Sequence, residues 1–254
     1  MKATIEHRQK KYIVDLSKPL DLSIPFSPLG PRAWYVDPMQ ITPVKNQLFN
    51  GSVADGGSVN FRNIIFNPHG HGTHTECVGH ISEEIFFISR TLNQYFFIAD
   101  VVSIKPLAVT EDWGVRKKGD LIITLSQLQK ILEKNIPEAL IIRTLPNHLE
   151  KLHRNYSNTN FCYFEAEALA FLADKGVEHL LVDLPSIDRE QDGGMLESHH
   201  AFWNYPMKTR VSSTITEFIY VSDTITDGEY FLNLQVARFD NDAAPSRPII
   251  FKIL

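Results

Sequence analysis

Apolar residues along this chain gather in short runs that alternate with polar stretches containing glycine and proline. Runs of this length, rich in β-branched and aromatic residues, are typical of strands in a buried sheet. In the first half of the chain we predict strands over residues 12–17, 61–66 and 95–104. In the second half we predict strands over residues 139–143, 177–183, 214–221, 230–237 and 248–254.

Helical signals fall between these strands. Ser126 and Gln129 have the spacing of a capping box, which predicts a helix from there through about Glu133. Residues 164–175 are good helix formers, and Gly176 supplies a left-handed stop. A strand, a helix and a further strand in succession predict an α/β fold with a parallel or mixed β-sheet flanked by helices.

A proline-rich segment covers residues 19–43, and its six prolines exclude it from a central strand or helix. We expect this segment to wrap over the surface. It contains Phe26, Trp34 and Tyr35. These rings either wall a substrate pocket or cover the core.

Length and composition favour one domain over residues 1–254, because 43% of the residues are hydrophobic and the chain has no internal repeat or low-complexity linker. The net charge is -5, and no basic run is longer than Arg8 to Lys11, which excludes nucleic acid as a partner. The most apolar run, residues 95–104, contains Asp100 and is far shorter than the roughly 20 residues that cross a bilayer.

Two further features indicate a cytoplasmic protein. Residues 1–11 are polar and contain no apolar stretch that could serve as a secretory signal. The two cysteines, Cys77 and Cys162, are too few for a disulfide framework. We expect Cys77 to be a small buried hydrophobe, although it could be a ligand or nucleophile.

The chemistry of the chain is concentrated in residues 69–80, which we call the histidine motif: His-Gly-His-Gly-Thr-His-Thr-Glu-Cys-Val-Gly-His. It holds four of the ten histidines. A single histidine in a polar loop is usually solvated, but imidazoles and a carboxylate at this density are the ligands of Zn²⁺ and similar ions. In an extended segment His74 and Glu76 point to the same side, and His80 falls on that side too.

Distant residues must complete such a site. His199 and His200 follow a loop with two glycines, and Glu217 interrupts an apolar strand. A buried carboxylate costs several kcal/mol unless it is paired or coordinated, so we favour Glu217 as a ligand over a solvent-facing residue. Arg143, at a strand end, could pair with a carboxylate near the site, but an ordinary surface ion pair is favoured. His148 and His153 lie in a polar loop and are expected to be solvated.

The pattern Gly72-Thr73-His74-x-Glu76-x-x-x-His80 resembles the signature of the cyclase family of metal-dependent hydrolases, written His-x-Gly-Thr-His-x-Asp-x-Pro-x-His. This family includes the bacterial kynurenine formamidases and the isatin hydrolases. Shorter stretches resemble other family elements in the same order along the chain: Asp15-Leu16-Ser17, residues 141–144, residues 181–188 and Pro245-Ser-Arg-Pro248.

The resemblance implies a mixed-sheet α/β fold of the swivelling β/β/α type and a homo-oligomer. It also implies one or two divalent ions, with Zn²⁺ favoured over Mn²⁺. The implied metal ligands are His74, Glu76, His199 and Glu217, and His80 is the implied acid/base residue. The family's first histidine falls at Gly70 here, between His69 and His71, and we take His69 as that ligand in preference to His71. Glu76 replaces an Asp, and Val78 replaces the Pro.

By this resemblance the protein hydrolyses an amide, a formamide or a cyclic amide, in the manner of an arylformamidase. Its substrate would be a small molecule, of aromatic character if the rings of residues 26–35 line the pocket. The alternatives are a lactone or lactam hydrolase, a cyclase or dehydratase, and a metal-dependent binding protein without catalysis.

Overall fold

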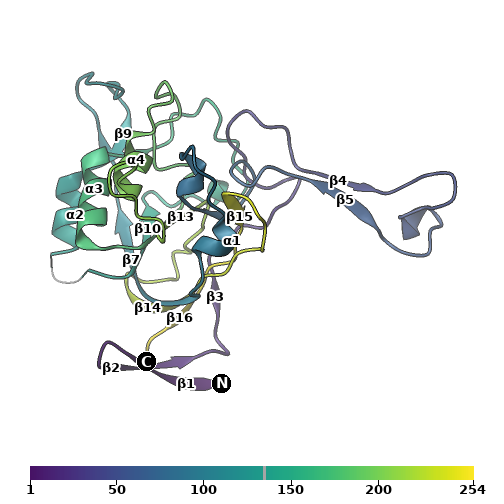
Figure 1. Ribbon diagram of the computed structural model, residues 1–254, viewed down its shortest axis with the longest axis horizontal. Helices are drawn as coiled ribbons and strands as arrows, with labels where there is room; N and C mark the ends of the chain where they lie inside the picture. Colours follow the sequence, from purple (N-terminus) through teal and green to yellow (C-terminus); the bar gives the residue numbers. More distant parts are fainter. Residues whose placement is uncertain (134–135) are drawn as a thin grey trace.

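The computed structural model describes residues 1–133 and 136–254 of the chain. A nine-stranded mixed sheet runs through the centre of the body (Figure 1). Its strands, in spatial order, are Ala243–Pro245 (β15), His74–Glu76 (β6), Thr214–Glu217 (β13), His179–Val182 (β12), Ala139–Thr144 (β10), Phe96–Ile104 (β7), Gly228–Asn233 (β14), Ile249–Lys252 (β16) and Leu20–Asp21 (β3). The strands predicted in the second half of the chain are all present, but β13 ends at Glu217 and β14 at Asn233, each four residues before its predicted end.

The middle of this sheet is parallel, and the outer strands on both sides are antiparallel. All six residues of β10 are buried. Leu140 and Ile142 pack into one core and Ile141 into the core on the other face. Since each fully buried aliphatic side chain contributes about 1.5–3 kcal/mol, a strand covered on both faces needs a continuous apolar run.

Helices cover the face that Leu140 and Ile142 point to. They are Leu125–Ile131 (α2), Ala166–Lys175 (α3) and Glu197–Trp203 (α4), with a short α1 (Ile88–Thr91) elsewhere. Single 3₁₀ turns lie at Val53–Asp55 (η1), Val78–His80 (η2) and Leu149–Leu152 (η3). Helix α3 ends at Gly176, whose φ of 86° confirms the predicted left-handed cap.

The capping box of α2 was predicted at the wrong residues. Thr124, not Ser126, caps the helix, and its side chain accepts a hydrogen bond from the Gln127 amide. Both pairs have the same sequence spacing. The structure uses the earlier one because Thr124 directly follows β9 (Leu121–Ile123) in an extended conformation, which an N-cap requires.

Three smaller sheets complete the fold. Strands β8 (Leu107–Ala108), β9 and β11 (Tyr163–Phe164) form one, and β1 (Lys2–His7) pairs with β2 (Lys10–Asp15) in a hairpin at the N-terminus. The hydrophobic pattern predicts only the second strand of that hairpin. The alternation of Ala3 and Ile5 with polar residues lets β1 lay one face on a small core, but two apolar residues are a weak signal.

The third small sheet pairs β4 (Gln40–Pro43) with β5 (Arg62–Ile65). Residues 40–65, here called the arm, project from the body as a hairpin (Figure 1). The strand predicted over residues 61–66 is thus confirmed, and it lies outside the central sheet. In the part of the chain that the structure describes, we find no helix long and apolar enough to cross a membrane.

Candidate metal centre

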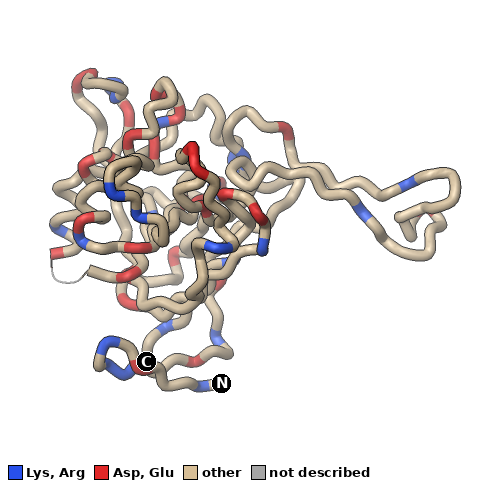
Figure 2. Tube along the Cα trace, in the orientation of Figure 1, with Lys and Arg blue, Asp and Glu red and all other residues tan. Residues whose placement is uncertain are grey.

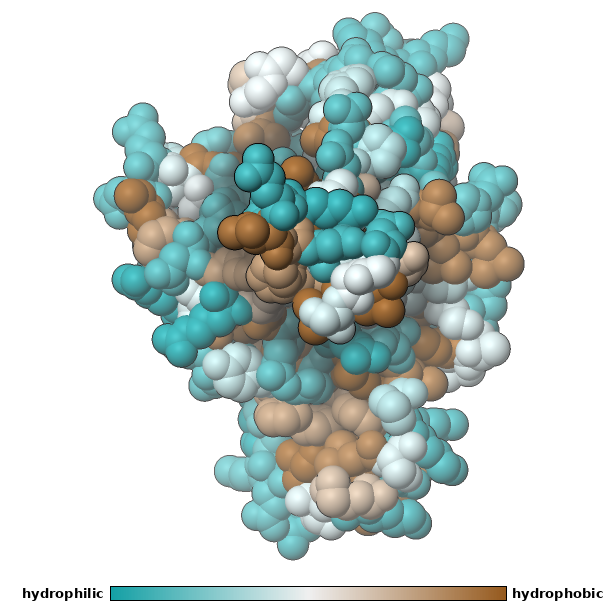
Figure 3. Space-filling model, turned by 90° about the vertical axis from the view of Figure 1, so that its right-hand side faces the viewer, coloured by the Kyte–Doolittle hydropathy of each residue, from teal (hydrophilic) through white to brown (hydrophobic). Residues whose placement is uncertain are grey.

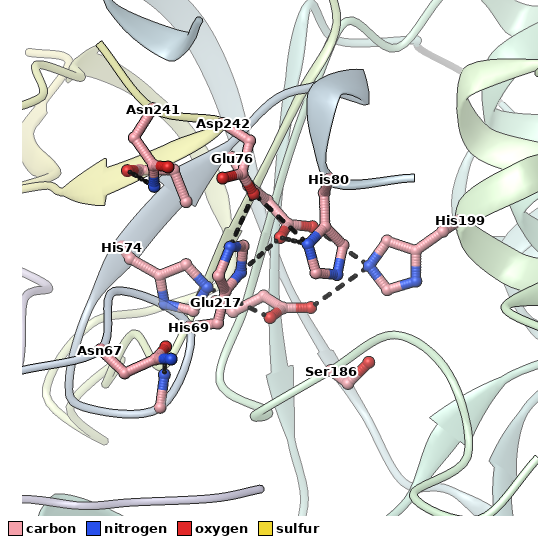
Figure 4. A network of polar contacts seen from close by, with 12 residues as sticks. Asn67, His69, His74, Glu76, His80, Ser186, His199, Glu217, Asn241 and Asp242 are labelled. Atoms are coloured by element: carbon pink, nitrogen blue, oxygen red, sulfur yellow. Dashed lines mark hydrogen bonds and ion pairs between the residues drawn. The ribbon is translucent and has the colours of Figure 1, made fainter. Parts of the chain in front are cut away.

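The candidate site lies where β6 is held between β15 and β13 (Figure 4). His74 and Glu76 point to the same side of β6, as predicted, and both are fully buried. The antiparallel register places Glu217 of β13 directly opposite His74. Thr75 points the other way, where its hydroxyl meets that of Thr216 at 2.8 Å.

A tight loop brings His69 toward these strand residues. Gly72 adopts a φ of 86°, and a Cβ there would lie 3.1 Å from the Ile24 carbonyl oxygen and from the Phe26 ring. Thr73 anchors the loop because its hydroxyl donates to the Phe218 carbonyl oxygen and accepts from the Ile24 amide. Glycine at position 72 therefore lets the loop take this path without backbone strain or close contacts.

The two histidines beside Gly70 point in different directions. His69 enters the cluster, where its ring lies 5.2 Å from that of His74. His71 is buried elsewhere: its Nδ1 accepts from the Asn67 amide at 2.9 Å, and its Nε2 lies 2.7 Å from the Asp37 carbonyl oxygen. Both ring nitrogens of His71 are engaged there.

His199 comes from α4, and Asp188 fixes its position. The carboxylate of Asp188 accepts from the amides of Ser198 and His199 in the first turn of α4. Asp188 also lies 2.6 Å from His199 Nδ1, and this contact leaves the Nε2 atom of the ring to face the cluster. His80 arrives from η2, and its ring stacks on that of His69 with centroids 4.3 Å apart.

Glu76 lies at the middle of the cluster. Its Oε1 is 3.1 Å from His199 Nε2, and its Oε2 is 3.0 Å from His69 Nδ1. Glu217 likewise lies between two histidines, His74 and His199. Its Oε2 is 3.4 Å from His74 Nε2, and its Oε1 is 3.9 Å from His199 Nε2.

Several ligand-type atoms in the cluster are buried without a partner. Within residues 1–133 and 136–254, no hydrogen-bond partner is found for His69 Nδ1, His74 Nε2 or Glu76 Oε2. The 3.0 Å contact between His69 and Glu76 is short, but it lacks the alignment of a hydrogen bond. The ligand atoms of His69, His74 and Glu76 all lie within 4.8 Å of one another, as do those of Glu76, His80 and His199. The donor set and its geometry fit a divalent metal ion.

The charges in the cluster favour an added positive charge. Burial alone would lower the pKa of His69, but Asp242 and Glu76 outweigh it and raise that pKa to about 10. Burial likewise opposes protonation of His199, yet Asp188 and Glu76 raise the pKa of its ring. Burial together with the nearby Glu76 carboxylate raises the pKa of Glu217. The carboxylates hold protons in the cluster for the same electrostatic reason that they would hold a cation.

Asp242 is a member of the cluster that we did not predict. Its Oδ2 lies 2.8 Å from His69 Nε2 and 3.4 Å from His80 Nδ1. These histidines lower the pKa of Asp242 against the effect of its burial. Asp242 directly precedes β15, whose Ala243 lies opposite Glu76. In the sequence it stands in a polar turn, where acidic residues are common, so only the pairing of β15 with β6 reveals it.

A cavity of about 370 Å³ opens beside the cluster, and its volume suits a small molecule. The residues that line it are Trp34, Asn67, His69, His80, Ser186, Leu196, His199 and Glu217. Trp34 and Leu196 have φ values of 60° and 45°, and Phe218 after Glu217 has 54°. Such left-handed backbone costs about 1 kcal/mol or more per residue, so the backbone at and beside the cavity is locally strained.

Other candidates from the sequence lie elsewhere. Phe26 packs on Phe66, with centroids 5.1 Å apart, and Tyr35 is 59% exposed, so of the three rings only Trp34 lines the cavity among the residues described. Cys77 is buried, as expected, and burial raises the pKa of its thiol. His148 and His153 are exposed, again as expected.

Arg143 is not the surface residue that we favoured. Its guanidinium is buried at the end of β10, where it donates to Ser103, to two backbone carbonyl oxygens and to Asp227 at 3.0 Å. The pairing with a carboxylate is therefore real, but it anchors the residue 222–227 loop instead of serving the cluster.

Comparison with known proteins supports the fold and identifies relatives. Residues 14–189 match a family model described as "Putative cyclase". Kynurenine formamidase from Bacillus cereus is 24% identical over 239 residues, a match that covers 93% of this chain and 96% of that protein. Kynurenine formamidase from Bacillus thuringiensis is 26% identical over 239 residues, with the same coverage.

Two solved structures share the fold. One, described as a predicted metal-dependent hydrolase from Bacillus stearothermophilus, has a TM-score of 0.62 at 20% identity and covers 92% of this chain and 98% of its own. An isatin hydrolase bound to the product analogue thioisatinate has a TM-score of 0.62 at 13% identity and covers 93% of each chain. The predicted α/β fold with a mixed sheet is confirmed.

Proposed function

The chain belongs to the cyclase family whose model matches residues 14–189, and from this premise we propose that it is a metal-dependent hydrolase of a small amide, formamide or cyclic amide. The observation that carries the proposal is the convergence of three buried atoms that find no hydrogen-bond partner among the described residues: His69 Nδ1, His74 Nε2 and Glu76 Oε2. Buried polar atoms without partners are rare in folded proteins unless an ion or water completes them.

We propose that His69, His74, Glu76, His199 and Glu217 hold the metal, with Zn²⁺ favoured over Mn²⁺ because imidazole and carboxylate together suit zinc. The two oxygens of Glu76 face different histidines, His69 and His199, which supports room for one or two ions. When bound, the ion would supply a Lewis acid that acidifies water and polarises a carbonyl oxygen.

The remaining residues of the site have roles that follow from their positions. His80 is half-buried on the cavity wall, and Asp242 contacts its Nδ1, so Nε2 is available to a reactant. We assign His80 as the base that takes a proton from water and returns it to the leaving nitrogen. Asp242 orients the His80 ring through its contact with Nδ1. Trp34 and Leu196 supply an apolar wall against which an aromatic amide could lie.

We further propose that residues 1–254 form one domain that acts in the cytoplasm. The single domain is supported by the central sheet, which takes β3 from near the N-terminus and β16 from the C-terminus.

Metal analysis combined with hydrolysis assays tests this function. The purified protein should contain tightly bound metal and hydrolyse at least one of N-formylkynurenine, isatin and formanilide. His74→Ala should lose both metal and turnover, whereas His153→Ala, which removes an exposed histidine, should keep both. Turnover retained by His74→Ala would refute the mechanism. Metal without turnover of any of the three would favour a binding protein or a lactone substrate instead.

A further inference from the structure

A second cavity, with a volume of about 280 Å³, lies where the chain leaves β10 and β12. Among the described residues, none lines both this cavity and the one beside the metal cluster. Its wall is mainly apolar and includes Pro106, Leu121, Leu145, Pro146, Phe161 and Leu184. The apolar side chains seen from the side of the arm stand on an open surface (Figure 3), whereas these side chains surround a hollow. The second cavity is therefore suited to a small molecule with an apolar body.

Aromatic rings separate the second cavity from the metal cluster. Phe161 lines the second cavity, and its ring lies 6.0 Å from that of Trp34, which lines the cavity beside the cluster. Tyr156 also lines the second cavity, and its ring packs 5.6 Å from that of Phe218, the residue after Glu217. A molecule in the second cavity therefore lies behind this aromatic wall and leaves the substrate site free.

Arg154 brings a positive charge to the second cavity. It is half-buried, and its guanidinium lies over the Tyr156 ring, 5.0 Å from the ring centroid. Within residues 1–133 and 136–254, no carboxylate or other hydrogen-bond acceptor is found for this guanidinium. Glu150 also lines the cavity, but it is exposed to solvent and does not pair with Arg154. A guanidinium is a planar fork of N–H donors, and its geometry matches a carboxylate.

The buried lysine of the second cavity is already neutralised. Lys151 Nζ lies 2.6 Å from Asp183 and donates to the carbonyl oxygen and the hydroxyl of Thr144 at 2.8 and 2.9 Å. These contacts use the three donors of the ammonium group. Figure 2 shows acidic and basic residues interspersed along the described chain. Arg154 is therefore a local cation, and it matches a ligand that carries one negative charge.

Tyr156 offers a hydrogen-bond donor beside Arg154. The tyrosine is 3% exposed, and its hydroxyl has no partner in the part of the chain that the structure describes. Burial raises the pKa of Tyr156, so the hydroxyl keeps its proton and can donate. Burial also raises the pKa of the Cys162 thiol in the same cavity to about 12, so this group adds no negative charge that would repel an anion. A buried hydroxyl without a protein partner is uncommon unless water or a ligand completes it.

We propose that the second cavity binds a small apolar monocarboxylate, such as an aromatic or branched acid. Its carboxylate pairs with the Arg154 guanidinium and accepts a hydrogen bond from the Tyr156 hydroxyl, while its apolar body lies against the wall. A phosphate is disfavoured, because Lys151 is already paired and its second negative charge would find no further cation among the described lining residues. The proposal goes beyond the hydrolase function, since binding here requires neither metal nor turnover.

Ligand-detected NMR titration of the full chain with phenylacetate tests the proposal, with phenylacetamide as its uncharged counterpart. Phenylacetate should bind with a Kd of about 1 mM or tighter, and phenylacetamide at least about 10-fold more weakly, because it cannot pair with a guanidinium. Arg154→Met removes the charge and should weaken phenylacetate binding at least about 10-fold. Arg62→Met removes an exposed arginine of the arm, so it is the matched control and should keep native affinity. Circular dichroism should show that both variants are folded.

Two further variants locate the bound acid. Tyr156→Phe removes only the hydroxyl and should weaken phenylacetate binding about 3- to 10-fold. His74→Ala should keep native affinity for phenylacetate, because the second cavity lies apart from the cluster. Loss of binding in His74→Ala would place the carboxylate on the metal and overturn the proposal. Equal affinity for phenylacetamide, native affinity of Arg154→Met, or displacement of phenylacetate by inorganic phosphate would overturn it as well, as would absence of binding at about 10 mM phenylacetate.

Discussion

A buried histidine at the start of β12 offers a quantitative test of how burial sets the acid stability of this fold. His179 is 4% exposed, its ring lies 4.2 Å from that of Phe97, and its Nδ1 is 2.8 Å from Thr214 Oγ1. Burial, with a smaller contribution from Arg210, lowers the pKa of His179 from 6.5 to about 4. The folded protein thus keeps this imidazole neutral at a pH where the unfolded chain protonates it.

The sign and size of the effect follow from proton linkage. Between pH 6.5 and about 4 the unfolded state binds more protons at His179 than the folded state, so the free energy of unfolding falls as the pH falls. The contribution is fully present above pH 6.5 and is lost on passing down through the folded pKa. A pKa difference of this size makes the loss about 3 kcal/mol at pH 4, since each pKa unit corresponds to about 1.4 kcal/mol.

Urea unfolding of the native chain and of His179→Gln, followed by fluorescence between pH 7.5 and 4, measures this contribution. Glutamine cannot titrate but can still meet Thr214. The native chain should therefore lose about 3 kcal/mol of unfolding free energy relative to the variant as the pH falls from 7.5 to 4. His153→Gln, at an exposed site, controls for removal of a histidine as such. A native-minus-variant difference that stays constant from pH 7.5 to 4 would refute the reasoning.

Three further predictions concern the buried charges, the site loop and Asp242. Lys151→Met should destabilise the fold by about 3–5 kcal/mol in urea unfolding. Lys151 Nζ lies 2.6 Å from Asp183, and this carboxylate would remain buried without its cation. A variant as stable as the native chain would contradict this. Gly72→Ala should lower metal affinity and cost about 1–2 kcal/mol of stability, because the φ of residue 72 is 86°. Calorimetric titration with Zn²⁺ measures the metal affinity, and a variant with native affinity would count against this prediction. Asp242→Asn should lower kcat about 10- to 100-fold and leave the metal content unchanged, because Asp242 contacts His80. A steady-state assay measures kcat, and elemental analysis measures the metal. Loss of the metal would instead make Asp242 a ligand.

Features with a local cause were readable from the sequence. Strand β10 is covered on both faces, so its apolar run is continuous, and the run alone located the centre of the sheet. His74 and Glu76 face the same way because side chains alternate along an extended chain, and this needs no knowledge of the rest of the fold. Gly176 ends α3 for an equally local reason.

Features that depend on chain path were not readable. His69 and His71 are equivalent by spacing, and only the bend at Gly72, held by Thr73 and Phe218, turns one ring into the cluster and the other out. Asp242 joins the site through the pairing of β15 with β6, whose partners are more than 160 residues apart in sequence, far beyond the reach of any local sequence pattern.

The sequence by itself therefore determined the α/β class and the central strands and indicated candidate ligand residues, because periodicity and residue chemistry are properties of short segments. Tertiary structure alone decided which histidine faces the cluster, that Asp242 contacts both His69 and His80, and that residues 40–65 leave the body as an arm. These outcomes depend on where distant backbone segments meet, and that is set by the packing of the whole sheet.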